Sequence, residues 1–191
     1  MDNLKRLLFT GGARRRLTGI LKGVGALAVL FATTAPAAAP SLEQAVKASY
    51  LFKFAPFIEW PSSAFSGSRG NFQICIAGQN PFGTTMEDVV RGQRISGRTI
   101  IIRKLSETPI GQCNILFAGK PDSNDTDAVA MASGKAILTV TDADSGVNGA
   151  MIAFLMKEGR VRFQINDAVA RANGLRISSK LLQLAVPTDK K

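Results

Sequence analysis

The sequence predicts one α/β domain: a mixed β-sheet of about six strands flanked by helices, with a late antiparallel hairpin. After residue 41, short apolar runs typical of strands alternate with stretches of helical periodicity. Near the end of the chain, the two-residue loop Glu158-Gly159 separates two strand-like runs, as in a tight hairpin. About 150 of the 191 residues follow the N-terminal segment, enough for one domain with its own core.

The predicted domain opens with a helix and a strand–turn–helix unit. Ser41 is suited to cap a helix whose apolar residues recur every three to four positions. This helix should end near Trp60-Pro61, and Pro56 should kink it. Residues 72–77 then form the first predicted strand and residues 84–90 a helix, which together open an α/β unit.

The middle of the domain adds three strands and one helix. The strands are predicted at residues 99–105, 113–118 and 135–141. The second of these is a continuous apolar run, as expected for a strand that is buried on both faces of the sheet. Residues 122–131 form the predicted helix, because acidic side chains at its start suit the helix dipole.

The last part of the chain contains the hairpin and two short helices. Residues 149–157 and 160–166 are the fifth and sixth predicted strands, antiparallel across the two-residue loop. A helix follows at residues 167–172. The amphipathic run at residues 178–184 is the last predicted helix, and the hydroxyl of Ser178 is suited to cap it.

Residues 1–39 have the order of an export signal, with basic, then apolar, then small side chains. The basic part includes three consecutive arginines, the apolar part spans residues 23–32, and alanines fill most of positions 35–39. A signal peptidase would cut after Ala37 or Ala39. The alternative is an uncleaved membrane anchor, but threonines and prolines interrupt the apolar run before the roughly 20 residues that a spanning helix needs.

Export divides the chain into a cleaved signal at residues 1–39, a periplasmic domain at 41–187 and a charged tail at 188–191. The signal suits the Sec route, while Arg14-Arg15 leaves the twin-arginine route open. It holds six of the 24 basic and one of the 14 acidic residues, so the net charge of +10 falls to about +5 after cleavage. No block of five basic residues occurs, and we expect no nucleic-acid binding.

The composition argues against catalysis. The chain contains no histidine, which removes the usual general base and the commonest zinc ligand. Gly134-Lys135 lacks the rest of a phosphate-binding loop, and Ser178 lacks the lysine spacing of serine acylases. Asp142 and Asp144 follow a strand, where carboxylates could hold a metal or exchange protons, although acids in such loops are more often turn formers. We expect no catalytic residue, no metal and no cofactor.

Two cysteines, Cys75 and Cys113, lie beside strand-like apolar residues in the predicted domain. In an oxidising compartment an isolated pair indicates a disulfide, which on the chain-entropy model would stabilise the fold by roughly 4 kcal/mol. The alternative is a redox or metal site. The absence of a Cys-x-x-Cys spacing argues against that alternative.

Phe57 and Trp60 are the candidates for a partner-binding surface. They lie in an aromatic segment near the end of the first predicted helix, and Trp60 is the only tryptophan in the chain. Tryptophan is favoured at interface hot spots. The alternative is that these side chains pack the helix onto the sheet, and the two interpretations can hold for different side chains.

A series of motifs in the predicted domain follows one order along the chain. It includes Phe57-Ile58-Glu59-Trp60-Pro61 near the start and Arg160-Val161-Arg162-Phe163-Gln164-Ile165-Asn166 near the end. The full set comprises residues 50–54, 57–61, 72–78, 81–83, 97–98, 113–117, 138–142, 149–152, 160–166 and 174–185. In this order the motifs resemble the YfiR family over nearly the whole domain. Cys75 and Cys113 match the family's shared pair, whereas a second pair found in some members near residues 142–149 is absent.

The resemblance implies a non-enzymatic periplasmic protein. The type member of the family binds the periplasmic part of a membrane diguanylate cyclase and represses it, and an outer-membrane lipoprotein removes it. An inner-membrane sensor or diguanylate cyclase and an outer-membrane lipoprotein are therefore the expected partners, with cyclic-di-GMP and biofilm behaviour as the output. The resemblance also suggests a homodimer.

Two other classes of function stay open. One is a periplasmic receptor for a small ligand, with a pocket at the carboxyl ends of the strands, or an adaptor for another membrane sensor. The other is an enzyme that uses Asp142, Asp144 or Ser178.

Overall fold

The computed structural model describes residues 41–66, 70–122 and 127–187. The predicted export signal and the charged tail lie outside these residues. Within the described ranges, no helix is long and apolar enough to cross a membrane.

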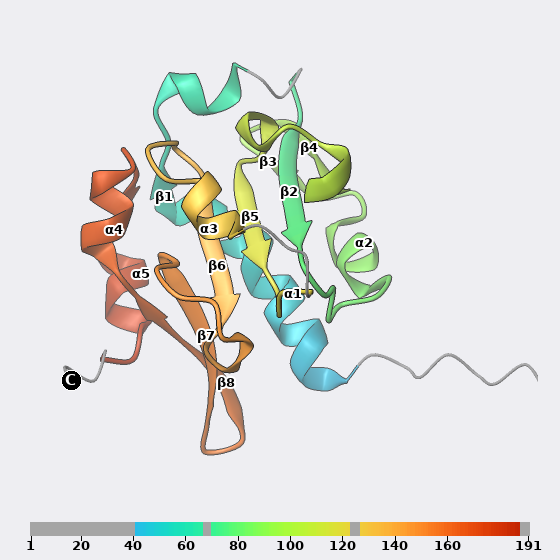
Figure 1. Ribbon diagram of the computed structural model, residues 1–191, viewed down its shortest axis with the longest axis vertical. Coiled ribbons are helices and arrows are strands. Elements are labelled where there is room, and N and C mark those ends of the chain that lie inside the picture. The colour runs from blue at the N-terminus through green and yellow to red at the C-terminus, as the bar shows by residue number, and fades with distance from the viewer. Residues whose placement is uncertain (1–40, 67–69, 123–126, 188–191) are drawn as a thin grey trace, which may run out of the picture. The chain divides into compact units, whose positions relative to one another are not determined.

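The described domain is built on a seven-stranded mixed sheet with the order β3-β4-β2-β5-β6-β7-β8 (Figure 1). The five central strands are parallel, and the edge strands β3 and β8 are each antiparallel to their neighbour. The predicted mixed α/β class is confirmed, with seven strands in this sheet instead of about six. The bounds are β2 Phe72–Ala77, β3 Arg94–Ile95, β4 Arg98–Lys104, β5 Ile115–Ala118, β6 Leu138–Asp142, β7 Ile152–Lys157 and β8 Arg160–Ile165.

Helices cover both faces of the sheet because the chain changes direction at β2. It passes from β2 to β4 and then returns to β5 on the other side of β2. Right-handed crossovers in opposite directions place their connections on opposite faces. Accordingly, α2 (Thr85–Val90) packs in the main core with Ile74, whereas α3 (Ala128–Met131) packs with Cys75 in a smaller core on the other face. Figure 1 shows α3 in front of the sheet and α1 behind it.

Helix α1 (Leu42–Phe54) begins as predicted and ends earlier. The Ser41 hydroxyl accepts a hydrogen bond from the Gln44 N–H, and the Ser41 N–H donates to the Gln44 side chain, which completes a capping box. The predicted end near Trp60-Pro61 is wrong, because the helix gives way to a 3-10 turn at Ala55–Phe57. Pro56 has no N–H, and its ring would clash with the carbonyl four residues earlier, so it ends the α-helix instead of kinking it.

A two-stranded ribbon not predicted from the sequence joins the two ends of the domain. Strand β1 (Ile58–Glu59) pairs antiparallel with β9 (Arg176–Ile177). Two-residue strands are too short to show a period of two, so the sequence carries no signal for them. The Ser178 N–H also donates to the Phe57 carbonyl at 2.9 Å, which anchors the segment after α1 beside the last helix.

The hairpin and the helices at the end of the chain confirm their predictions. Strands β7 and β8 pair around Glu158 and Gly159, whose φ angles of 52° and 69° are those of a type I′ turn. Helix α4 (Asp167–Ala172) follows, and α5 (Ser179–Leu184) is capped by the Ser178 hydroxyl, which accepts a hydrogen bond from the Leu181 N–H.

Some predicted boundaries are wrong. The described part of α3 begins only at Ala128, because the Asp127 carboxylate caps it by accepting hydrogen bonds from two backbone N–H groups; residues 123–126 lie outside the described ranges. Strands β5, β6 and β7 begin two or three residues later than predicted, because turns and loop hydrogen bonds occupy the preceding residues. Strand β3 was not predicted, and it joins β4 through a second two-residue turn at Ser96-Gly97.

The main core lies between the sheet and α1. Phe54 on α1 packs against Phe154 and Phe163 of the hairpin, with ring-centroid distances of 5.8 and 5.1 Å. Phe82 and Phe117 pair edge to face at 4.7 Å near the end of β5. These contacts hold α1 against the hairpin and set its first turn beside the carboxyl ends of the strands.

Candidate functional site

The carboxyl ends of parallel strands are where open α/β sheets usually bind ligands, at the position where the strand order reverses. Here that position lies between β2 and β5, where the loops that follow these two strands are in contact. The Gln79 N–H donates to the Lys120 carbonyl, and the Gly119 N–H donates to the Ala77 carbonyl, both at 2.9 Å. A Cβ on Gly119 would lie only 2.1 Å from the Gln79 carbonyl oxygen. The two loops therefore contact backbone to backbone. A cavity of about 250 Å³ lies against this contact, lined by Ala77, Gly119 and Asn148 among others.

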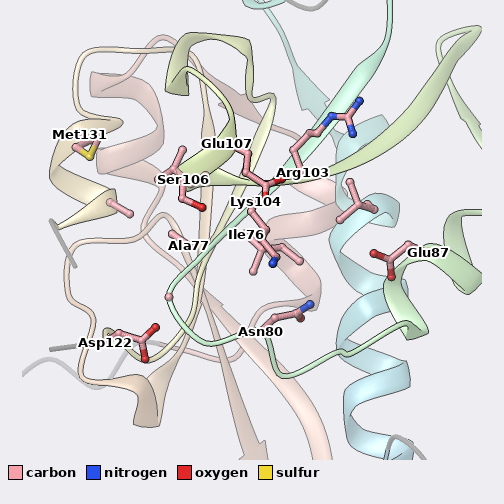
Figure 2. A pocket seen from close by; sticks show the side chains of 14 residues that line it. Ile76, Ala77, Asn80, Glu87, Arg103, Lys104, Ser106, Glu107, Asp122 and Met131 are labelled. Atoms are coloured by element: carbon pink, nitrogen blue, oxygen red, sulfur yellow. The ribbon is translucent and has the colours of Figure 1, made fainter. Parts of the chain in front are cut away.

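A larger cavity lies beside this contact, next to the ends of β2 and β4 (Figure 2). Its volume is about 760 Å³. Figure 2 shows Glu87 on one side of the hollow, Asp122 and Met131 on the other, and Asn80 between them. Ligand pockets are usually enclosed and mostly apolar, whereas charges of both signs line this open hollow. The charged residues are Glu87, Arg103, Lys104, Glu107 and Asp122.

A second group of charges lies where α1 meets the end of β6, beside a cavity of about 370 Å³. The Lys47 Nζ is 2.6 Å from Glu43 Oε1 and 2.7 Å from Asp142 Oδ1, and the Lys47 side chain is only 10% exposed. Burial alone lowers the pKa of Lys47, but hydrogen bonds and charge attraction from Asp142 and Glu43 outweigh burial and raise this pKa above 10.5. Lys47 therefore stays protonated and ties α1 to β6.

The candidate catalytic residues Asp142, Asp144 and Ser178 do not lie together in one site. Asp142 is bound to Lys47, and Asp144 is exposed on the 3-10 turn at Ala143–Ser145. Ser178 caps α5 and lies next to the β1–β9 ribbon. Gly134 is held by the Asn173 side chain, which accepts its N–H. Among the described residues, no three His, Cys, Asp or Glu side chains are placed to hold a metal ion.

Phe57 and Trp60 are half-buried and pack against the main core. The Trp60 indole N–H donates to the Ala55 carbonyl at 3.0 Å, and its ring meets Phe72 edge to face at a centroid distance of 5.6 Å. Much of the Trp60 side chain is therefore used in packing within the domain. A partner contact through the exposed remainder of these two rings stays a prediction.

The predicted disulfide is confirmed. Cys75 and Cys113 are bonded, with their Cα atoms 5.7 Å apart, and both are almost completely buried. Cys75 lies in β2, and Cys113 ends the turn before β5, so the bond crosses between neighbouring strands. Nearby, buried Asn114 accepts the Gln73 N–H and donates to the Ala64 carbonyl at 2.7 Å, which ties this strand end to the segment after Trp60.

Comparison with known proteins adds one match. The model of the YfiR/HmsC-like family matches residues 44–186, about three quarters of the chain. The chain belongs to the YfiR/HmsC-like family. No curated protein gives a significant match. The resemblance in the sequence is thereby confirmed, and the YfiR/HmsC-like match includes both bonded cysteines, Trp60 and the hairpin.

Sequence reasoning missed two features of this part of the structure. The Glu43–Lys47 spacing is that of a helical ion pair and could have been recognised, but Asp142 joins it from nearly a hundred residues away. The second feature is the edge of the sheet formed by β3 and β4, which depends on the strand order.

Proposed function

We propose that this YfiR/HmsC-like protein is a non-enzymatic periplasmic regulator that binds the periplasmic part of a membrane diguanylate cyclase, or of a similar sensor, and represses it. Family membership over residues 44–186 carries the proposal. Binding lowers cyclic-di-GMP, and with it biofilm formation. An outer-membrane lipoprotein relieves the repression, and the protein works as a homodimer.

Two further observations support the location and the mode of action. The buried Cys75–Cys113 bond suits an oxidising compartment, and residues 1–39 have the pattern of an export signal. The candidate catalytic side chains have structural partners: Asp142 binds Lys47, and Ser178 caps α5. These observations favour a function that resides in a binding surface.

The test measures cyclic-di-GMP in cells that lack the protein. Deletion should raise cyclic-di-GMP, and the full chain supplied in trans should lower it again. The matched control lacks residues 2–39, so it stays in the cytoplasm and should not restore the low level. Unchanged cyclic-di-GMP in the deletion strain across growth conditions would refute the proposal.

The second candidate function is a receptor for a small ligand, and the hollow of about 760 Å³ beside β2 and β4 favours it. Such a ligand would carry charges of both signs, to match Glu87, Asp122 and Arg103. A thermal-shift screen of zwitterionic metabolites tests this function, because a ligand that binds only the folded protein raises its melting temperature. No stabilisation by any of them would count against it.

A further inference from the structure

One edge of the main sheet is open. Strand β3 pairs only with Arg98 and Thr99 of β4. In the described part of the chain, no strand pairs with the outer side of β4 from Ile100 to Lys104. The opposite edge is different, because the Val186 N–H donates to the Phe163 carbonyl at 2.9 Å, so the C-terminal segment contacts the end of β8.

The pairing pattern shows which backbone groups of β4 face the open side. The Asn114 N–H donates to the Gln73 carbonyl, so Gln73 and every second residue of β2 face β5. Ile74 therefore faces β4, where Ile102 is its opposite residue. In a parallel pair, a residue that faces the neighbouring strand bonds to the two residues on either side of its opposite residue. Ile74 therefore bonds to residues 101 and 103, which face β2. The backbone groups that face outward belong to Ile100, Ile102 and Lys104.

A groove and several basic residues lie along this edge of the sheet. The groove has a volume of about 390 Å³, and its lining includes two basic residues, Arg91 and Arg94, one acidic residue, Glu87, and the apolar Val90 and Ile100. The segment from Arg94 to Lys104 carries four basic residues and no acidic one. A second copy of the chain paired along this edge would bring like charges together, which is destabilising. An acidic strand would bring opposite charges together.

We propose that the outer edge of β4 binds an extended acidic segment of the protein partner by strand addition. The backbone groups of Ile100, Ile102 and Lys104 provide the hydrogen bonds, and Arg94 and Arg103 select the charge. This inference rests on the proposed function, in that it names the chemistry of the partner's contact.

The sharpest variant is Lys104→Pro. Lys104 has a φ of −77°, which proline adopts without strain, and its N–H faces away from β2, so the substitution removes only an outward donor. Lys104→Ala is the matched control, because it removes the same charge and keeps the N–H. Each lost hydrogen bond should weaken binding about fivefold. Lys104→Pro should therefore bind about fivefold more weakly than Lys104→Ala.

The probe is a capped hexapeptide of alternating Glu and Val, added to the mature domain and followed by hydrogen exchange in NMR. We expect slower exchange at the amides of Ile100, Ile102 and Lys104. The binding should weaken with salt and in Arg103→Glu. A Lys–Val peptide, or the Glu–Val peptide with every backbone N–H methylated, should leave these amides unprotected.

Three results would overturn the proposal. The first is no protection of the three amides at millimolar peptide, and the second is equal binding of the peptide by Lys104→Pro and Lys104→Ala. The third is protection of these amides at high protein concentration without peptide, because that result indicates pairing between two copies of the chain. In cells, the two proposals fail separately. If Lys104→Pro loses peptide binding and still restores low cyclic-di-GMP, strand addition by the partner is wrong and the proposed function stands. If deletion leaves cyclic-di-GMP unchanged while the wild-type domain binds the peptide, the proposed function is wrong and the strand-binding edge stands.

Discussion

Replacing both cysteines by alanine should lower the stability of the domain by about 4 kcal/mol, by the chain-entropy relation for a bond that closes a loop of 38 residues. The folded state should change little, because β2 and β5 are also paired through their backbones, with Cys75 opposite Leu116. For a domain of about 150 residues, this loss should reduce the melting temperature by roughly 8–16 °C.

Urea unfolding of the mature domain, with and without a phosphine reductant, measures the effect. The reduced wild type and the Cys75→Ala/Cys113→Ala variant should unfold at nearly the same urea concentration, well below the oxidised wild type. The reductant should not affect the variant. A loss of less than about 1 kcal/mol, far below the loop-closure value, would refute the reasoning, as would a reduced wild type that matches the oxidised one.

The same variant separates the structural role of the bond from the binding role of the surface. At a temperature where the variant is still folded, it should bind the partner as well as the oxidised wild type, because both sulfur atoms are buried away from the surface. Loss of binding by the folded variant would show that the bond shapes the binding surface directly.

The remaining predictions concern α1 and the close approach of the strand ends. Lys47→Met should cost about 2–3 kcal/mol in urea unfolding, less than the roughly 3–5 kcal/mol of a fully buried pair, because the two carboxylates are partly exposed. The neutral triple variant Glu43→Gln/Lys47→Met/Asp142→Asn should be more stable than Lys47→Met, and equal stability would contradict the ion triad. Because the pKa of Lys47 is raised in the folded state, its contribution is complete below pH 10.5 and is lost as the pH rises beyond that value, so the wild type should lose more stability than Lys47→Met in alkaline urea titrations. Gly119→Ala should lower the free energy of unfolding by about 2–4 kcal/mol, because its Cβ would clash with the backbone. Gly111→Ala is the control, since its Cβ would meet nothing within 4 Å, and it should change the free energy of unfolding by no more than about 0.5 kcal/mol. Similar losses for both variants would refute the close approach of the strand ends.

Features encoded by neighbouring residues could be predicted from the sequence. Ser41 caps α1 through Gln44, three residues away, and Glu158-Gly159 specifies the hairpin turn without help from the rest of the fold. The helix at residues 167–172 and the strand at residues 72–77 were predicted with the bounds that the structure has. In these segments, local propensity and tertiary packing favour the same structure.

Features that depend on tertiary contacts could not be predicted in this way. The bond of Asp142 to Lys47 and the pairing of β1 with β9 join residues that are far apart in the chain. The close backbone approach at Gly78 and Gly119, and the outer side of β4 that no described strand pairs with, both follow from the strand order. Apolar runs indicate that a strand is buried but not which strands are its neighbours.

The sequence predicted the class of function but not where on the protein the binding surface lies. The missing histidine, the cysteine pair and the family motifs indicated a binding protein, and Trp60 was the natural anchor. In the structure, the Trp60 indole N–H is used within the fold, whereas the outer side of β4 has backbone groups that no described strand pairs with. Side-chain type alone does not reveal a surface made of backbone groups.

The central claim is that the protein acts by occupying a surface of a membrane partner, and affinity purification from membranes tests it most directly. Crosslinked cells expressing the full chain with a C-terminal tag should yield, by mass spectrometry, an inner-membrane protein with a periplasmic part and a diguanylate cyclase or other signalling domain. The tagged chain that lacks residues 2–39 should not enrich it. If no inner-membrane protein is enriched over this control, the account is contradicted.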